Sequence, residues 1–371
     1  MPNKSPLRIT PPAPIDDPLD PSALGPLSVV PLVPEDVLVR HKALVPTDNR
    51  FRAAARLLQA LWREDRELPI GSYFDVEGKR VRLGSRITEA AGKRGVNLLT
   101  PEIAALVRRE CVYRELGAMI EVDRLRSNLL SSMPLTFNVF APLKLDLRVA
   151  TRFMAELFPG LMSEVRAIKF EHSPGRGSAV YVRDYSAFDL AVYGLSAAGQ
   201  RVMVGWEIKY SEGSFEPTPN RISDRQLAIT ANSGLYRDAE DPTLFLNPHQ
   251  QLTRELNLCQ AILDHGDVDI GLFVLASPRL NHLTQAMGES FGALLNPPQD
   301  GRASFVSITL ERVLEALVSI GMVEHAQALH RRYFDFHLVD GELELEASRP
   351  VAKRKSSAAA DADVQPQIVA Q

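Results

Sequence analysis

The chain has 371 residues, of which 45% are hydrophobic and 24% charged, and its formal net charge is -4. This balance is typical of a soluble globular protein with one large domain or two ordinary ones. The negative charge argues against a protein that coats nucleic acid, although a DNA-cleaving enzyme needs only a locally positive groove.

The cysteines and the apolar stretches bear on the compartment. Cys111 and Cys259 lie far apart in sequence, which predicts neither a disulfide framework nor a structural zinc site. The longest apolar stretches, such as Ile270–Ala276, are well short of the roughly 20 residues that cross a bilayer, and the N-terminus lacks the apolar segment of a secretory signal. The sequence therefore predicts a cytoplasmic protein without a membrane span.

The first part of the chain contains three segments with different sequence patterns. Residues 1–36 contain ten prolines and little periodic hydrophobicity, so we expect a disordered or extended arm over 1–45. Apolar residues then recur at helical spacing and predict a helix over 49–66. Residues 73–83 alternate around Glu77-Gly78-Lys79, which is typical of a hairpin.

The segment 46–130 is expected to be mainly helical. Thr100-Pro101 supplies a helix N-cap and a proline at the first helical position, and the pattern is interrupted near Gly117. From Lys79 to Arg126 there are eleven Lys and Arg against six Asp and Glu, so this stretch is a candidate DNA-contacting surface. An ordinary solvated helix surface explains the same composition equally well.

From Leu143 onward helices alternate with strands, and the sequence predicts a core over 131–345. The predicted elements are a helix over 147–158, strands over 165–171, 188–193 and 201–210, a polar insertion over 211–247, a helix from Pro248 to Asp264, strands over 269–276 and 305–308, and a helix from Leu310. The order helix, three strands, helix, strand predicts an α/β fold in which a mixed central sheet has helices on its faces. The tail over 346–371 is rich in Ala, Ser, Lys and Asp, and we expect it to be disordered.

Charged side chains interrupt two of these apolar strands. Asp189 lies within Phe188–Tyr193, and Glu207-Ile208-Lys209 follows the apolar run Val202–Trp206. Because side chains alternate along a strand, Glu207 and Lys209 point to one face while Ile208 points to the other. The turn-like segment 194–200 allows the two strands to pair as a hairpin, which would bring Asp189 and Glu207 together.

Two neighbouring carboxylates, together with the backbone carbonyl of Ile208, suit a hard divalent cation such as Mg²⁺, with Mn²⁺ as a substitute. Lys209 would lie beside an attacking water, where its ammonium could stabilise negative charge or, with a lowered pKa, deprotonate the water. The alternative is a strand-end ion pair between Asp189 and Lys209. The similar Glu77-Gly78-Lys79 sits at a turn without a partner aspartate, so we assign it no chemistry.

At these residues the sequence resembles the PD-(D/E)XK nuclease superfamily, and more closely its restriction-endonuclease-like branch. The resemblance covers roughly residues 125–340 and is carried by Ser131–Asn138, Lys169–Arg176, the Asp189 strand, Gly205–Tyr210 and Asn247–Arg254. It implies a restriction-endonuclease-like core in which Asp189, Glu207 and Lys209 hold metal and water. The proline that often precedes the aspartate is Phe188 here.

The resemblance also implies auxiliary positions. Two glutamates compete as a further metal ligand: Glu171, at the end of the strand before Asp189, and Glu156, on the preceding helix, which a solvated surface carboxylate explains as well. Gln251 and Arg254 lie three residues apart on one helix face and resemble polar positions that approach the substrate phosphate.

Arg176 and Arg183 flank the strand of Asp189 and are candidates for phosphate contacts. The function implied is a Mg²⁺-dependent endonuclease that hydrolyses DNA, of a restriction or defence type, with a homodimer left open. A catalytically inactive nucleic-acid-binding or scaffold protein with the same fold, and an RNA or repair nuclease, are the alternatives.

Overall fold

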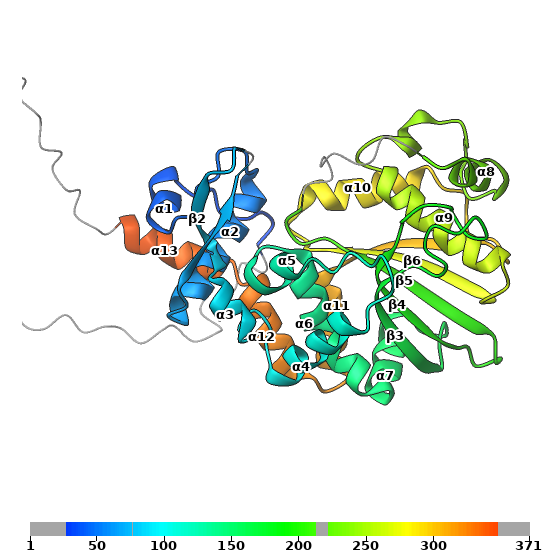
Figure 1. Ribbon diagram of the computed structural model, residues 1–371, viewed down its shortest axis with the longest axis horizontal. Coiled ribbons are helices and arrows are strands. Elements are labelled where there is room, and N and C mark those ends of the chain that lie inside the picture. The colour runs from blue at the N-terminus through cyan, green and yellow to red at the C-terminus, as the bar shows by residue number, and fades with distance from the viewer. Residues whose placement is uncertain (1–26, 76, 213–221, 348–371) are drawn as a thin grey trace, which may run out of the picture.

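The computed structural model describes residues 27–75, 77–212 and 222–347. Its centre is a five-stranded sheet in the order β3-β4-β5-β6-β7 (Figure 1). The strands are β3 (Glu164–His172), β4 (Phe188–Leu195), β5 (Arg201–Ile208), β6 (Ile270–Ser277) and β7 (Ser304–Thr309). The pairs β3·β4 and β4·β5 are antiparallel, and β5·β6 and β6·β7 are parallel. The predicted mixed sheet is therefore confirmed.

Helices cover both faces of the sheet, and the central strands are correspondingly apolar. One face carries α6 (Ser132–Leu145), α7 (Leu147–Leu157) and α11 (Leu310–Ser319), and the other carries α9 (Gln250–Asp264) and α10 (His282–Ala293) (Figure 1). Strands β5 and β6 are almost continuously apolar because they are buried on both sides. Two separate clusters of buried side chains form, one on each face.

The insertion over 211–247 has ordered parts. It contains α8 (Asp224–Asn232), which packs against α9, and a short 3-10 helix, η2 (Pro242–Phe245). Residues 213–221 within it lie outside the described residues, as do the proline-rich residues 1–26 and the tail from residue 348. The predictions of disorder for 1–26 and 348–371 therefore concern segments that the structure does not describe. The predicted tail began at residue 346, which is wrong for residues 346 and 347 because they end a helix.

The segment 46–130 combines helices with a two-stranded hairpin. Its elements are α2 (Arg50–Asp65), β1 (Ile70–Phe74), β2 (Arg80–Ile87), α3 (Glu89–Lys93), α4 (Pro101–Val112) and α5 (Val122–Ser127). Asn49 and Thr100 cap α2 and α4 by accepting hydrogen bonds from the N–H groups of Arg52 and Ile103. The cap at Thr100 is the one that the sequence predicts. Gly78 has a φ of +75° in the hairpin turn, a conformation that favours glycine.

The expected disorder of 1–45 is wrong for its last third. Residues Glu35–Arg40 form α1, and Val37 and Leu38 are buried in the larger hydrophobic cluster. The prolines did not prevent this helix because Pro34 lies at its N-cap rather than inside it. The apolar surface that this helix buries offsets the conformational entropy that the segment loses when it becomes ordered. Composition alone did not reveal this burial.

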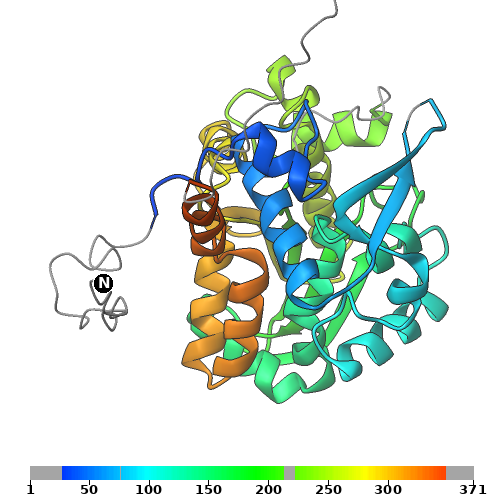
Figure 2. The same cartoon turned by 90° about the vertical axis from the view of Figure 1, so that its left-hand side faces the viewer.

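The C-terminal helices α12 (Val323–Tyr333) and α13 (His337–Ala347) pack against α2, and Figure 2 shows them side by side. The fully buried Arg332 joins the two regions: its guanidinium lies over the ring of Trp62 at 4.2 Å and donates to the carbonyl of Asn97 at 2.6 Å. One hydrophobic cluster consequently runs from α2 through the helices beneath the sheet. Within the described ranges every helix is too short or too polar to traverse a bilayer.

Candidate active site

The strand register places three carboxylates at the same level on adjacent strands. Phe170 pairs with Leu190 and His172 pairs with Phe188, so Glu171 on β3 lies opposite Asp189 on β4. On the other side the last pair is Leu190 with Trp206, which puts Asp189 level with Glu207. The hairpin predicted from sequence thus brings the two acids together and adds Glu171 beside them.

The backbone of β5 fixes the aspartate. The N–H of Ile208 donates a 2.8 Å hydrogen bond to Oδ2 of Asp189. Ile208 itself is fully buried in the cluster beneath the sheet, whereas Glu207 and Lys209 face α9. This is the alternation of faces that the sequence predicts.

Phe188 stands where the resemblance leads one to expect proline, and a glycine on the next strand makes room for its larger side chain. Its ring lies against Gly205, and a Cβ at that position would come within 2.6 Å of the ring. Glycine on β5 therefore provides the space for phenylalanine on β4, directly beside Asp189.

Lys209 forms its ion pair with Glu207 rather than with Asp189. Its Nζ lies 2.6 Å from Oε1 of Glu207 and donates to Oε1 of Gln251 at 2.8 Å. Gln251, on α9, donates from Nε2 to Oε1 of Glu207 at 2.7 Å and to Oε1 of Glu255 at 2.9 Å. The strand-end ion pair of Asp189 with Lys209 is therefore not formed, and Gln251 joins the acid and the lysine.

The carboxylates repel one another strongly. Burial raises the pKa of Asp189 well above its ordinary value, and the charges of Glu207 and Glu171 raise it further. Burial and the charge of Glu207 likewise raise the pKa of Glu171 to about 8, against the opposing effect of Arg176. Burial by itself would lower the pKa of Lys209, but the charge and hydrogen bond of Glu207 outweigh it and raise that pKa.

Glu171 is held in position by its neighbours. It has a φ of +48°, and its carbonyl accepts a 2.8 Å hydrogen bond from Nη2 of Arg176. The next residue, His172, is buried and linked to Tyr193 at 2.8 Å and to Glu115. Arg176 therefore braces the end of β3, and only 5% of its side chain is exposed for a phosphate contact.

The other predicted site residues lie further out. Glu156 pairs with Arg312 of α11 at 3.3 Å, on the face of the sheet opposite α9, so the structure does not bring it to the acids. Its side chain is 36% exposed at the helix surface, which fits the alternative of a solvated surface carboxylate. Arg183 is exposed, with a φ of +57°, and Arg254 is partly buried on α9, where its carbonyl accepts from Gln226 of α8 at 3.3 Å.

Two acidic residues of this region were not predicted. Glu255 on α9 is only 3% exposed, and burial together with the charge of Glu207 raises its pKa well above the ordinary value. Glu212 accepts from the N–H groups of Ser132, Tyr210 and Ser211 and so fastens the start of α6 to the end of β5. Glu255 could have been found from its spacing of four residues from Gln251, which places both side chains on one helix face. Glu212 had no such signal, because it lies outside the apolar pattern of the strand.

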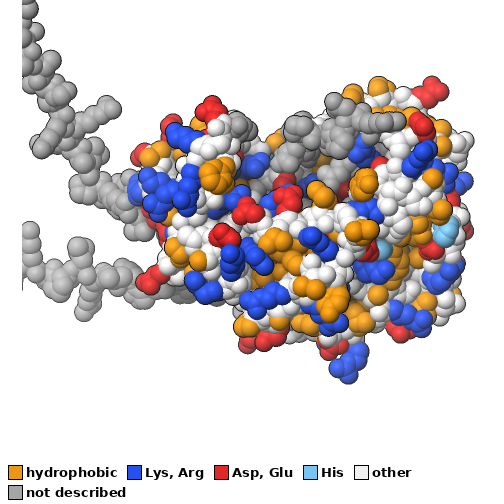
Figure 3. Space-filling model, viewed as in Figure 1, with side chains coloured by type: hydrophobic (Ala, Val, Ile, Leu, Met, Phe, Trp, Pro, Cys, Tyr) orange, Lys and Arg blue, Asp and Glu red, His pale blue; other side chains and the backbone are white. Residues whose placement is uncertain are grey.

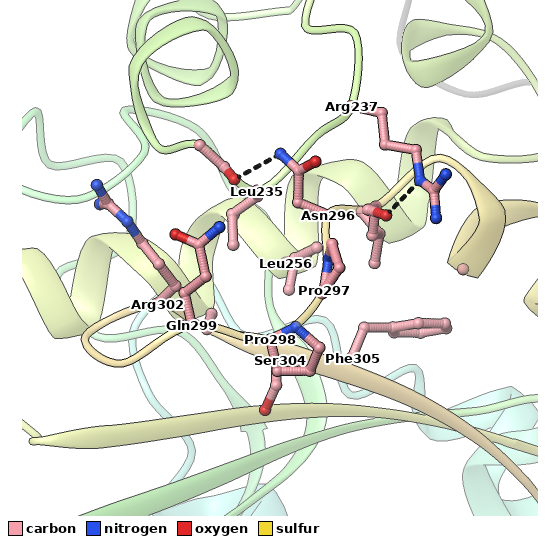
Figure 4. A pocket seen from close by; sticks show the side chains of 14 residues that line it. Leu235, Arg237, Leu256, Asn296, Pro297, Pro298, Gln299, Arg302, Ser304 and Phe305 are labelled. Atoms are coloured by element: carbon pink, nitrogen blue, oxygen red, sulfur yellow. Dashed lines mark hydrogen bonds between the residues drawn. The ribbon is translucent and has the colours of Figure 1, made fainter.

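A cleft away from these carboxylates lacks this chemistry. The one in Figure 4, of about 230 Å³, lies between α9, α10 and the start of β7, and its lining residues include no acid. Asn296 and Arg237 close it by donating to the carbonyls of Gly234 and Leu295 at 3.0 Å and 2.8 Å (Figure 4).

The donor set beside Asp189 suits an oxygen-seeking cation. Oδ1 of Asp189 and Oε2 of Glu207 accept no hydrogen bond from any described residue, while the opposite oxygen of each carboxylate is engaged. Positive charge placed between them would relieve the repulsion that raises the pKa of Asp189. In the described part of the chain, however, no three His, Cys, Asp or Glu side chains are already gathered closely enough to hold a metal ion.

Comparison with known proteins gives one match. A family model of the PD-(D/E)XK nuclease superfamily matches residues 46–335, well over half of the chain. The match includes the strands of Asp189 and Glu207, the helix of Gln251, and the segment 46–130. Neither a curated protein nor a solved structure matches the chain.

Proposed function

The chain belongs to the PD-(D/E)XK nuclease superfamily, and on that premise we propose that it is a metal-dependent endonuclease that hydrolyses DNA phosphodiester bonds. The observation that carries the proposal is the alignment of Glu171, Asp189 and Glu207 on adjacent strands with Lys209 paired to the last of them. Like charges are not gathered in this way for stability, because each raises the free energy of the others' ionised form.

Asp189, Glu207 and the backbone carbonyl of Ile208 would hold Mg²⁺, with Mn²⁺ as a substitute, and Glu171 is the auxiliary ligand. The cation supplies Lewis-acid stabilisation of the negative charge that develops on the scissile phosphate. Asp189 and Glu171 are partly exposed, so substrate can approach them from the solvent.

Lys209 contributes a fixed positive charge. Its ion pair with Glu207 and its hydrogen bond to Gln251 orient the ammonium group on the α9 face of the sheet. The raised pKa supports the role of an ammonium that stabilises developing negative charge over the role of a general base. Gln251 acts through this pair by holding both partners in register.

Substrate choice follows from the surfaces around this centre. Arg124 of the segment 46–130 lies 3.6 Å from Glu212, just after β5, and α8 of the insertion packs against α9. We infer that these two regions contact DNA on either side of the scissile bond. A restriction or defence role, a homodimer and a cytoplasmic location remain predictions from the sequence.

The test is incubation of the purified protein with supercoiled plasmid and Mg²⁺, beside a Lys209→Ala variant. We expect nicked and linear DNA with the wild type only. Absence of cleavage in both samples, or equal cleavage in both, counts against the proposal. Parallel reactions with RNA, linear duplex and single-stranded DNA separate an endodeoxyribonuclease from an RNA or repair nuclease.

A further inference from the structure

A second cleft, of about 330 Å³, lies between the segment 46–130 and the end of β5. Its walls come from α2, the β1–β2 hairpin, α5 and the residues that follow the catalytic strand. The side chains that matter most are Arg52, Arg56, Arg86, Arg124, Ser211 and Glu212. Figure 2 shows the hairpin standing out from the body of the molecule, and Figure 3 shows Lys and Arg side chains gathered over α3 and α5.

The lining of this cleft holds more positive than negative charge. Four arginines line it against two carboxylates, those of Asp48 and Glu212. Both oxygens of Asp48 accept hydrogen bonds from Arg56, at 2.6 Å and 3.0 Å. Arg52 pairs with the same carboxylate through its Nε, at 3.3 Å, and 34% of the Arg52 side chain remains exposed. The guanidinium of Arg52 therefore retains donor capacity that an anion can use.

The cleft adjoins the catalytic centre. Ser211 and Glu212 come directly after Lys209 and Tyr210 on the chain, and the charge of Lys209 acts on the carboxyl of Glu212. The charge of Arg124 acts on Glu171 in the same way. An anion in the cleft would consequently lie within electrostatic range of the carboxylates that hold the cation.

Neighbouring carboxylates orient the arginines of this cleft. Arg86 pairs with Asp123 at 3.0 Å, and Arg124 pairs with Glu121 at 3.3 Å and lies 3.6 Å from Glu212. These contacts orient the side chains but leave 34% of the Arg124 side chain exposed. Planar guanidinium groups at one polar cleft match the geometry of phosphate oxygens. Ser131 and Asn128 add neutral polar groups to the same lining.

We propose that this arginine-lined cleft binds backbone phosphates of the DNA beside the scissile bond and so positions the strand at Asp189 and Glu207. The inference rests on the proposed function for the identity of the ligand as DNA. Arg52 and Arg124 make the phosphate contacts, and Arg56 holds Asp48 and the wall of the cleft in place.

The test measures binding separately from cleavage. The affinity of a fluorescein-labelled DNA duplex is measured by anisotropy with Ca²⁺ in place of Mg²⁺, for Arg52→Ala, Arg124→Ala and the double variant. Arg148→Ala is the matched control, because its side chain is 94% exposed and lies on α7. Thermal unfolding verifies that each variant is folded, and Arg52→Gln and Arg124→Gln replace any alanine variant that is not.

We expect each cleft substitution to raise Kd about tenfold and to lower the salt dependence of binding by about one phosphate contact, while Arg148→Ala changes neither. Cleavage of saturating DNA in a single turnover should fall much less than the affinity.

Cleft variants that bind with the wild-type Kd and salt slope overturn the inference, even if the wild type cleaves plasmid. Weakened binding in the cleft variants supports it, even if the wild type fails to cleave, in which case only the proposed activity is lost. Wild-type protein that binds no DNA overturns it.

Discussion

The N–H of Ile208 donates a 2.8 Å hydrogen bond to Oδ2 of Asp189, so the backbone of β5 positions the acid of the neighbouring β4. Ile208 is itself anchored in the hydrophobic cluster beneath the sheet. The placement of Asp189 therefore depends on strand pairing and core packing rather than on a flexible side-chain contact. Glu207, in contrast, is positioned by side chains on the α9 face of the sheet, those of Lys209 and Gln251.

Gln251 should matter for turnover more than for affinity. In Gln251→Leu the ion pair of Lys209 and Glu207 loses the amide that fixes both partners, and Glu255 loses its hydrogen bond. We expect the single-turnover rate to fall about 10- to 100-fold with little change in the Kd for DNA. Rate measurements at saturating DNA test this, and a variant with wild-type rate contradicts the role assigned to Gln251.

The fold and the proximity of Asp189, Glu207 and Lys209 could be predicted because both follow local rules. Asp189, Glu207 and Lys209 stood out as charged residues within apolar strands, and the short turn between those strands implied antiparallel pairing. The start of α2 followed from the spacing of apolar residues, and the start of α4 followed from the capping side chain of Thr100. Each of these signals lies within a few residues of the feature that it predicts.

Buried Arg332 should be a major source of stability. It stacks on Trp62 and donates to Asn97, so it links α12 to the segment 46–130. We expect Arg332→Ala to lower the free energy of unfolding by about 3 kcal/mol or more, because a large buried side chain and its hydrogen bonds are lost together.

Urea unfolding monitored by circular dichroism measures this change. Arg331→Ala is the neighbouring control: its side chain is 53% exposed and pairs only with Asp335, so we expect a change within about 0.5 kcal/mol. Equal effects of the two substitutions would show that the buried contacts of Arg332 contribute little.

His41 should make part of the stability depend on pH. Its ring lies 2.7 Å from Glu64 and 3.1 Å from Glu342, and the hydrogen bond to Glu64, reinforced by Glu342, raises the pKa of the imidazole despite its burial. Because the folded pKa is raised, this stabilisation is fully present below the unfolded pKa of about 6.5 and is lost as pH rises through the folded pKa.

His41→Gln should therefore be less stable than the wild type by about 1 kcal/mol near pH 6, and the difference should shrink toward pH 9. Urea unfolding at several pH values measures it, with the exposed His282→Gln as control. A difference that grows with pH would have the wrong sign.

The parts that could not be predicted depend on contacts distant in sequence. The alignment of Glu171 with Asp189 follows from the sheet register, and the place of Glu156 follows from its pairing with Arg312; neither contact has a local signal. Helix α1 is ordered because Val37 and Leu38 are buried in a hydrophobic cluster that includes residues of other elements. The pairing of Lys209 with Glu207 instead of Asp189 likewise depends on Gln251, which is more than 40 residues away.

The central claim is that Asp189 and Glu207 together hold the cation that DNA cleavage requires. Its most direct test is single-turnover plasmid cleavage across a Mg²⁺ titration for the wild type, Asp189→Asn, Glu207→Gln and the matched control Glu156→Gln. We predict that the first two substitutions each reduce the rate about 10³-fold at any Mg²⁺ concentration, whereas Glu156→Gln retains the wild-type profile. Wild-type Mg²⁺ dependence in either Asp189→Asn or Glu207→Gln would contradict the account.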